Sequence, residues 1–272
     1  MQPTTFDLSG RTAIVTGAGR GIGRACALAL AANGANVVLA SRTQAQIDAV
    51  HSEIKEGGGR GLALAADVTS KEETKALAAE TIAAFGSIDI LVNNAGTFIM
   101  KPLVPTAGQP SQLADMVPGF DDGFTDEDWY KTLDTNVTSV FRCCQAVAPQ
   151  MIAQKYGRII NISSVDADHG LRFAAAYCAS KGAIKSMTKA LAKEWVRFNI
   201  TVNCVAPGYT DTDLFPPVMH NEEIKAATAK QNIPMRRFAE PAEIAVPVVY
   251  LASDHASYVT GESIYIDGGV LA

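Results

Sequence analysis

The sequence predicts an α/β fold built on a doubly wound parallel sheet, and three observations support that class. Seven short runs rich in Val, Ile and Leu alternate with longer stretches of helical periodicity. The short runs show little polar alternation, which is typical of strands buried on both faces of a parallel sheet. Repetition of strand, helix and strand implies right-handed crossovers. The chain has 272 residues and no sequence repeat or low-complexity linker, so we expect one domain over 1–272.

The elements follow one another at regular intervals. The predicted strands are residues 12–16, 36–40, 62–66, 88–92, 158–163, 200–205 and 263–266. The predicted helices are residues 23–33, 44–56, 71–85 and 175–197, with a further amphipathic stretch over 126–154. Residues 97–124 break the rhythm, because four of the chain's twelve prolines lie there. We expect this insertion to be a solvated loop, a substrate lid or a subunit contact.

Composition excludes several classes of protein. Apolar residues make up 48% and charged residues 19%, which is outside the range of disordered chains. The net charge of −5 argues against a nucleic-acid partner. No apolar run reaches the roughly 18 residues of a membrane span, and no secretory signal is visible. Five irregularly spaced cysteines indicate reduced thiols and a cytoplasmic location, and the four histidines form no local metal motif.

A glycine-rich loop follows the first predicted strand and precedes a helix. It reads Thr16-Gly17-Ala18-Gly19-Arg20-Gly21-Ile22-Gly23, with the spacing GxxxGxG. Glycines allow the backbone to approach a pyrophosphate, and the following helix presents unpaired N–H groups to an anion. Because the strand and the helix stand in the right places, the loop predicts dinucleotide binding; the alternative is a tight turn without a ligand.

The end of the second predicted strand bears on the choice of cofactor. An acidic residue at this point usually binds the ribose 2′-hydroxyl, but here the chain has Ser41 and Arg42. Arg42, together with Arg20, is suited to a 2′-phosphate, which favours NADP over NAD. The alternative is that both arginines are solvated.

A tyrosine and a lysine lie four residues apart at the start of a predicted helix. Tyr177 and Lys181 therefore share one face of that helix. A nearby ammonium favours the phenolate and lowers the pKa of a tyrosine, so the pair suits acid–base catalysis. Ser164 ends the strand before it, at the sheet edge where ligands bind in open parallel sheets. Alone the Tyr–Lys spacing is common by chance, but Asn94 ends another strand at the same edge.

Together these motifs identify a resemblance to the short-chain dehydrogenase/reductase family over nearly the whole chain, and in particular to its 3-oxoacyl-ACP reductase-like members. The resemblance implies a Rossmann-type domain with seven strands in the order 3-2-1-4-5-6-7. It also implies a substrate lid over about 209–234, and a homotetramer, with a dimer as the alternative. The stretches 126–154 and 175–197 are candidates for pairing across two-fold axes.

The resemblance also implies roles for individual residues. Tyr177 would be the acid/base, Lys181 would hold the nicotinamide ribose, and Ser164, rather than Ser163, would polarise the substrate carbonyl. Asn136 would hold a water in a proton relay. The residues expected to contact the cofactor are Gly17, Arg20, Gly21, Ile22, Gly23, Ser41, Arg42, Asp67, Val68, Asn94, Ala95, Gly96, Tyr177, Lys181, Pro207, Gly208, Thr210 and Thr212.

The predicted activity is reversible, NADP-dependent conversion of a carbonyl compound into a secondary alcohol, acting on a small molecule. An NAD-dependent alcohol dehydrogenase and a cofactor-binding sensor without turnover are the alternatives. Several residues near the site have a weaker claim. Asp166, Asp168 and His169 are expected to be solvated loop residues, with a polar substrate as the alternative. Candidates for apolar pocket walls are Phe173, Tyr209 and Phe215, with packing in the core as the alternative.

Overall fold

Seven parallel strands form one sheet in the order β3-β2-β1-β4-β5-β6-β7, which confirms the predicted fold class. The computed structural model describes residues 6–105, 119–215 and 221–272. The strands are β1 (Thr12–Thr16), β2 (Asn36–Ser41), β3 (Arg60–Ala65), β4 (Ile90–Asn93), β5 (Gly157–Ile162), β6 (Ile200–Pro207) and β7 (Ser263–Ile266). In the register, Val15 of β1 faces Leu39 of β2 on one side and Val92 of β4 on the other.

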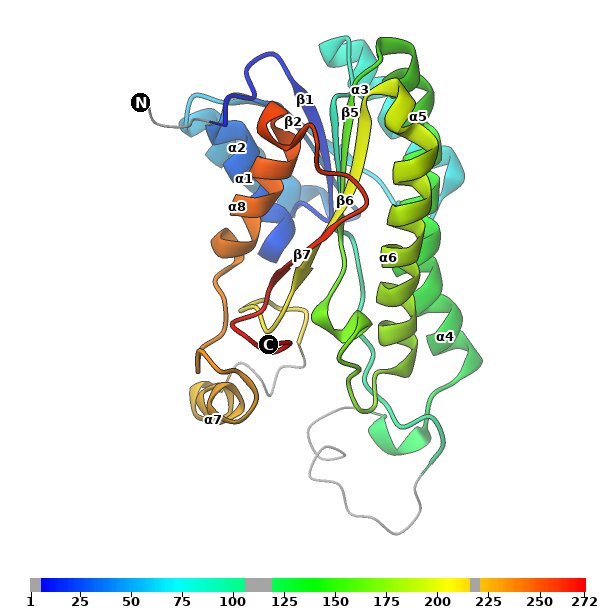
Figure 1. Cartoon of the computed structure of the whole chain (residues 1–272), viewed down its shortest axis with the longest axis vertical. Helices are drawn as coiled ribbons and strands as arrows, with labels where there is room; N and C mark the ends of the chain where they lie inside the picture. The colour runs from blue at the N-terminus through cyan, green and yellow to red at the C-terminus, as the bar shows by residue number, and fades with distance from the viewer. Residues whose placement is uncertain (1–5, 106–118, 216–220) are drawn as a thin grey trace.

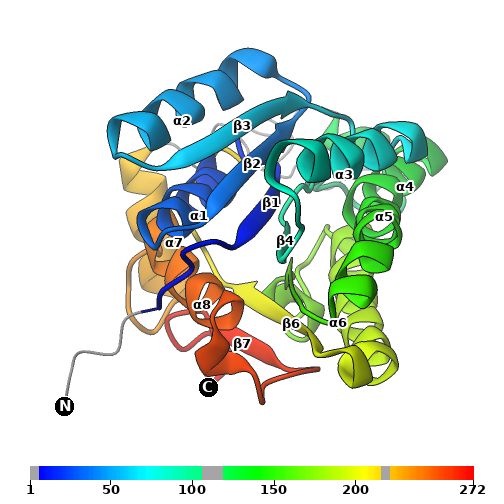
Figure 2. The same cartoon turned by 90° about the horizontal axis from the view of Figure 1, so that it is seen from above.

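Helices cover both faces of the sheet, as Figure 2 shows. One face carries α1 (Gly21–Ala32), α2 (Gln44–Glu56) and α8 (Pro241–Ala252), whose apolar side chains pack with the central strands. The other face carries α3 (Lys71–Phe85), α5 (Ser139–Gln154) and α6 (Ala175–Trp195), around a second apolar cluster. Because both faces are covered, β1, β4, β5 and β6 are buried along their whole lengths.

The amphipathic stretch over 126–154 is not one regular helix. A capping box between Thr125 and Asp128 starts α4 (Asp126–Leu133). A π-helical turn (Asp134–Thr138) then separates α4 from α5. Periodicity alone does not reveal this turn, because a π turn adds one residue without changing the apolar character of the face.

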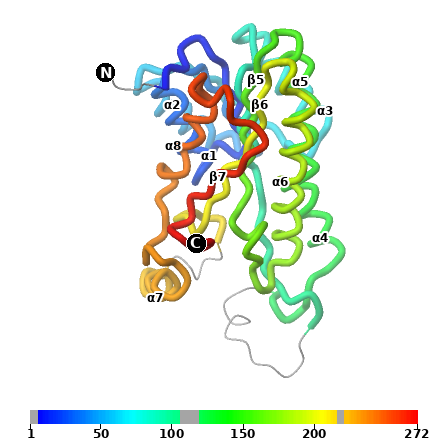
Figure 3. Tube along the Cα trace, in the orientation of Figure 1, coloured from blue at the N-terminus to red at the C-terminus, as the bar shows by residue number. Residues whose placement is uncertain are grey.

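The strands end at the edge of the sheet where α7 (Glu222–Asn232) lies in Figure 1. Four 3₁₀ turns complete the described chain: Phe120–Asp122, Val165–Ala167, Val196–Phe198 and Asp254–Ala256. The segment after β4 and the segment after β5 meet at this edge, where the N–H of Lys101 donates to the carbonyl of Phe173 at 2.8 Å (Figure 3). Residues 106–118 of the expected insertion and 216–220 of the expected lid lie outside the described part.

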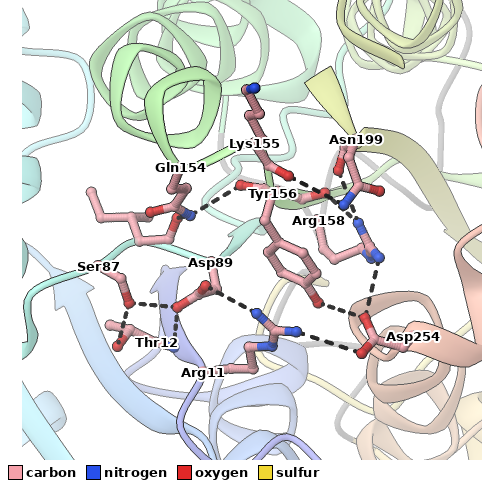
Figure 4. Close-up of polar contacts among 12 residues, drawn as sticks. Arg11, Thr12, Ser87, Asp89, Gln154, Lys155, Tyr156, Arg158, Asn199 and Asp254 are labelled. Atoms are coloured by element: carbon pink, nitrogen blue, oxygen red, sulfur yellow. Dashed lines mark hydrogen bonds and ion pairs between the residues drawn. The ribbon is translucent and has the colours of Figure 1, made fainter. Parts of the chain in front are cut away.

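A polar cluster joins the elements at the opposite edge of the sheet (Figure 4). The Arg158 side chain is 1% exposed, and its guanidinium donates to the carbonyls of Gly157 and Asn199 and to the carboxylate of Asp254 at 3.3 Å. The Tyr156 hydroxyl donates to the same carboxylate at 3.1 Å. The guanidinium groups of Arg11 and Arg158 lie 3.7 and 4.3 Å from the Tyr156 ring centroid, so two cations pack on one ring.

None of the described helices is long and apolar enough to cross a membrane. All five cysteines are free thiols, and all except Cys178 are buried.

Candidate active site

A cavity of about 410 Å³ opens at the carboxyl edge of the sheet. It runs from the glycine loop and the end of β2, past the ends of β1, β4 and β5, to Tyr177 and the segment after β6. All the sequence-predicted site residues line it except Gly23 and Asn136, which lie directly behind its wall. The cavity therefore collects residues that are up to 198 positions apart in the chain, from Gly17 to Phe215.

The glycine loop leaves room for an anion because its glycines carry no side chains. Larger residues would not fit at these positions. Gly17 and Gly21 have φ angles of +63° and +53°, which favour glycine. A Cβ on Gly23 would lie 2.2 Å from the Gly17 carbonyl oxygen, so the turn closes only around a bare backbone. Arg20 is the N-cap of α1 but its side chain does not cap it, so the first N–H groups remain available to a ligand. This cradle fits the pyrophosphate of a dinucleotide.

The end of the cavity beside β2 and β3 holds Ser41, Arg42, Asp67 and Val68. Arg42 is exposed at the rim. The Asp67 carboxylate accepts hydrogen bonds from the N–H and hydroxyl of Thr69 at 2.9 and 2.7 Å. Partial burial opposes ionisation of Asp67, but these bonds and the positive charge of Arg42 hold the pKa of Asp67 below its usual value.

The sequence suggests that Arg20 and Arg42 act together on one phosphate, whereas in the structure the Arg20 side chain pairs with an acidic residue. Its guanidinium pairs with the carboxylate of Asp213 at 3.3 Å, and both side chains are exposed. The pair links the glycine loop to the segment after β6. Because Asp213 is far from Arg20 in the chain, the local sequence does not indicate this contact.

Asn94 ties the end of β4 to the glycine loop. Its side-chain amide donates to the carbonyls of Thr16 and Gly17 at 3.0 and 3.2 Å. The Thr16 hydroxyl accepts from the N–H groups of Asn94 and Ala95 at 3.0 and 3.1 Å. The Asn94 amide nitrogen thus positions the loop, and only its remaining acceptors face the cavity. Gly96 comes next, and a Cβ there would lie 3.4 Å from the Asn136 side-chain oxygen and 3.8 Å from the Lys181 ammonium.

Asn136 lies within the π turn and is 1% exposed. Its amide nitrogen donates to the carbonyl of Thr97 and to the hydroxyl of Ser180, both at 3.0 Å. Its Oδ1 accepts from the N–H of Thr97 at 2.7 Å. Both side-chain donors are therefore engaged by protein, so a water at this residue would be held by an acceptor. π turns of this kind are frequent at functional sites.

The two serines at the end of β5 face different ways. The Ser163 hydroxyl is buried and donates to the main-chain carbonyl of Lys181 at 3.0 Å. The Ser164 hydroxyl donates to Asp166 at 3.2 Å and accepts from the N–H of the same residue at 3.1 Å. Ser164 is also the serine whose hydroxyl hydrogen-bonds Tyr177. The geometry thus favours Ser164 for contact with a substrate.

Tyr177 and Lys181 lie one turn apart near the start of α6, and both are buried. Burial raises the pKa of Tyr177, an effect that the Ser164 hydroxyl opposes and the charge of Asp166 strengthens. Burial lowers the pKa of Lys181 to about 8. The expected lowering of the tyrosine pKa by Lys181 is not found here, because the ammonium lies 5.6 Å from the ring centroid and donates to the carbonyl of Ile162.

An aromatic wall, comprising Phe98, Tyr209 and Phe215, faces Tyr177 across the cavity. The edge of Phe98 meets the Tyr177 ring at 5.0 Å between centroids, and Phe98 also contacts Phe215 at 6.1 Å. Tyr209 stacks on Phe215 at 6.0 Å. Of the two alternatives for Phe173, the structure favours packing, because Phe173 packs on Phe120 outside the cavity.

Sequence reasoning did not single out Phe98 and misjudged Asp166. Phe98 stands in a proline- and glycine-rich segment without periodicity, so no local signal marks it. Asp166 was expected to be solvated, yet it is partly buried and lines the cavity, whereas Asp168 and His169 are exposed. No group of three or more His, Cys, Asp or Glu side chains among the described residues could hold a metal ion.

The arrangement joins an anion cradle to a protonated tyrosine, a buried ammonium and a serine hydroxyl. The remaining predicted cofactor contacts lie at the end of β6 and in the segment after it. Gly208 approaches Asp267 so closely that a Cβ would lie 2.9 Å from its Cα, and the Thr210 hydroxyl donates to the carbonyl of Gly208 at 3.1 Å. Thr212 packs against the glycine loop at Gly21, and Pro207 lines the cavity. Such a site can bind a dinucleotide and exchange a proton with a second molecule beside it.

Comparison with known proteins gives concordant results. The family model described as "Enoyl-(Acyl carrier protein) reductase" matches residues 17–271. A 3-oxoacyl-[acyl-carrier-protein] reductase of Synechocystis is 38% identical over 270 residues, covering 97% of this chain and 98% of the relative.

Two solved structures are also similar to this chain. A 3-oxoacyl (acyl-carrier-protein) reductase from Agrobacterium tumefaciens with NADP bound is 31% identical, with a TM-score of 0.86 and coverage of 98% of this chain and 97% of the other. A gluconate 5-dehydrogenase from Burkholderia cenocepacia in complex with NADP and tartrate is 33% identical, with the same TM-score and coverage.

The fold, the matched family model and these relatives cover nearly the full length of the chain. The chain therefore belongs to the short-chain dehydrogenase/reductase family of oxidoreductases.

Proposed function

We propose that the protein interconverts a ketone or other carbonyl compound and a secondary alcohol by NADP-dependent hydride transfer, with Tyr177 as the general acid/base. The observation that carries this proposal is the meeting of Tyr177, Lys181 and Ser164 at one end of the cavity whose other end is the glycine cradle. A dinucleotide that spans the cavity from the glycine cradle would bring its reactive ring to the tyrosine, so one ligand accounts for both ends.

The residues of this chain would supply the proton and the positioning. Bound NADPH supplies a hydride to the carbonyl carbon, or NADP accepts one in the reverse direction. Tyr177 gives its proton to the carbonyl oxygen, so that one hydride and one proton convert the ketone to the alcohol. Ser164 orients that oxygen, and the Lys181 ammonium stabilises the phenolate that remains until it takes a proton from water. Asn136 is the residue beside which that water would be held.

The preference for NADP rests on Arg42. The chain offers no carboxylate at the end of β2, and the guanidinium at the rim of the cavity suits a 2′-phosphate. Structures of similar proteins with bound NADP support the same choice. The remaining predicted cofactor contacts, at Ile22, Val68 and Thr212 among others, belong to this proposal.

The proposal extends to assembly and location. Trp129 and Tyr130 of α4 and Phe141 of α5 are large side chains on the surface, 36%, 66% and 50% exposed. Their exposure supports pairing of this face across a two-fold axis in a homotetramer. Free thiols support a reducing, cytoplasmic location for a single-domain enzyme acting on a small molecule.

The test is consumption of NADPH and of NADH by the purified protein with a panel of ketones, β-ketoacyl thioesters, keto-sugars and diketones. We expect turnover with NADPH, and a Tyr177→Phe variant that binds NADPH normally but turns over about 10²–10⁴-fold more slowly. Faster turnover with NADH would favour the NAD-dependent alternative. Tight cofactor binding without turnover in either direction would favour the sensor.

A further inference from the structure

Asp166 places a carboxyl group inside the cavity beside the residues of the proposed reaction. It lies in the 3₁₀ turn Val165–Ala167, between β5 and α6. Its Oδ2 accepts the Ser164 hydroxyl proton at 3.2 Å, and its N–H donates to the same hydroxyl oxygen at 3.1 Å. Asp166 lines the cavity together with Tyr177 and Tyr209, and its charge raises the pKa of both tyrosines.

The neighbouring Asp168 has a structural role on the same loop, and its contacts differ from those of Asp166. The Asp168 carboxylate pairs with the Lys185 ammonium and accepts from the Tyr265 hydroxyl at 2.7 Å, outside the cavity. Asp166 has no ion pair with any described Lys or Arg, and no described residue donates to its Oδ1. One oxygen of Asp166 thus holds Ser164, and the other is available to a ligand.

The position of the Asp166 carboxylate limits what can bind. Its Oδ2 lies 3.2 Å from the Ser164 oxygen, which would hydrogen-bond the substrate carbonyl oxygen. A polar group on the carbon next to the carbonyl would therefore lie beside this carboxylate. Burial raises the pKa of Asp166, while the Ser164 hydroxyl and the nearby His169 oppose the rise. An ionised carboxylate accepts hydrogen bonds and repels anions, and both effects are strong where water is excluded.

We propose that Asp166 determines specificity for substrates that carry a hydroxyl group on the carbon next to the carbonyl, and against substrates that carry a carboxylate there. The inference rests on the proposed carbonyl reduction. The substrate hydroxyl donates to the Asp166 carboxylate, and the Ser164 hydroxyl turns its one proton from Asp166 to the carbonyl oxygen, which also accepts from Tyr177. Phe98, Tyr209 and Phe215 provide an apolar surface for the rest of the molecule.

The experiment compares three ketones with the same phenyl body: 2-hydroxyacetophenone, acetophenone and benzoylformate. The kcat/KM for each is measured with NADPH at pH 7 for the full chain and for Asp166→Asn, a variant of the same size without the charge. In the unaltered protein we expect the hydroxyketone to be preferred to the keto acid. In Asp166→Asn the ratio of keto acid to hydroxyketone rises by about tenfold or more. Taking the ratio within each protein cancels any common loss caused by a displaced Ser164.

Asp168→Asn is the matched control, because it removes the same charge from the same loop outside the cavity. Its ratio should equal that of the unaltered protein. An unchanged ratio in Asp166→Asn, or an equal change in both variants, would overturn the assignment while leaving the proposed reaction intact. Failure of the unaltered protein to reduce any of the three ketones while it turns over another carbonyl compound of the wider panel would overturn the specificity alone. Failure on the whole panel with NADPH and with NADH would overturn the reaction and the specificity together.

A second measurement needs no variant, should Asp166→Asn not fold. 1-Phenyl-1,2-ethanediol and mandelate are tested as competitive inhibitors of ketone reduction by the unaltered protein. We expect the diol to inhibit at a concentration about tenfold lower than mandelate. Equal inhibition, or stronger inhibition by mandelate, would contradict the role given to Asp166.

Discussion

The ammonium of Lys181 lies 5.6 Å from the centroid of the Tyr177 ring and 2.8 Å from the carbonyl oxygen of Ile162. Burial acts on the two residues in opposite directions, because it raises the pKa of the phenol and lowers that of the ammonium to about 8. At neutral pH the tyrosine is therefore protonated and the lysine is charged. In the proposed reaction Tyr177 gives its proton to the substrate, and Lys181 supplies the positive charge on the same helix face.

The pH dependence of carbonyl reduction should follow Lys181. Below pH 8 the ammonium is charged, and above pH 8 it loses the proton and with it the stabilisation of the phenolate. We expect kcat/KM, measured at low NADPH so that free enzyme predominates, to fall as pH rises through about 8. Samples returned to pH 7 control for inactivation. A profile that stays level to pH 10 would contradict this reading.

Arg42→Ala should weaken NADPH binding and leave NADH binding nearly unchanged. Loss of a charge-assisted hydrogen bond to the 2′-phosphate is expected to raise the Kd for NADPH about tenfold to hundredfold. Fluorescence titration with both reduced cofactors measures the effect. Arg197→Ala, in the 3₁₀ turn Val196–Phe198 outside the cavity, removes the same charge as a control. Equal weakening of both cofactors would count against a 2′-phosphate contact.

Gly23→Ala should abolish cofactor binding. The new methyl group would lie 2.2 Å from the Gly17 carbonyl oxygen and 2.4 Å from the Asn94 amide nitrogen, so the cradle must open. Overpacking of this kind costs about 1–3 kcal/mol of stability. Gly57→Ala is the control, because φ there is −75° and the nearest atom to a Cβ is 3.5 Å away. NADPH affinity equal to that of the unaltered protein would show that the loop has another conformation.

Asp254→Asn should destabilise the fold without affecting NADPH affinity. It weakens the ion pair of the buried Arg158 guanidinium and the hydrogen bond from Tyr156. We expect a loss of about 1–3 kcal/mol in the free energy of unfolding, lowered from the full cost of a buried pair because Asp254 is exposed.

Chemical denaturation at a fixed protein concentration measures the Asp254→Asn effect. Glu53→Gln breaks the exposed pair with Arg24 and should cost less than about 1 kcal/mol. Equal losses in the two variants would mean that burial of Arg158 does not matter.

Local patterns were sufficient for much of this molecule. Runs rich in Val, Ile and Leu located all seven strands to within two residues, because strands covered on both faces need mostly apolar side chains. The four-residue spacing of Tyr177 and Lys181 likewise predicted that both side chains share one helix face, because of helical periodicity. The family resemblance supplied the strand order, which composition and periodicity do not contain.

The remaining features depend on contacts between distant segments. Asp166 is partly buried and lines the same cavity as the aromatic wall, whose residues come from the segments after β4 and β6, far from Asp166 in the chain. Arg20 meets Asp213 across 193 positions of the chain. The π turn at Asn136 is fixed by Thr97 and Ser180, which come from two other parts of the fold.

The two edges of the parallel sheet have different roles in the molecule. Segments that line the cavity, such as residues 97–98 and 209–215, follow the strands at one edge, while the cluster around Arg158 holds the chain together at the other. Descendants of one ancestor can therefore exchange the first set of segments and acquire new substrates while inheriting the same anchor. Directed evolution confined to those segments should broaden the range of accepted molecules with little penalty in melting temperature.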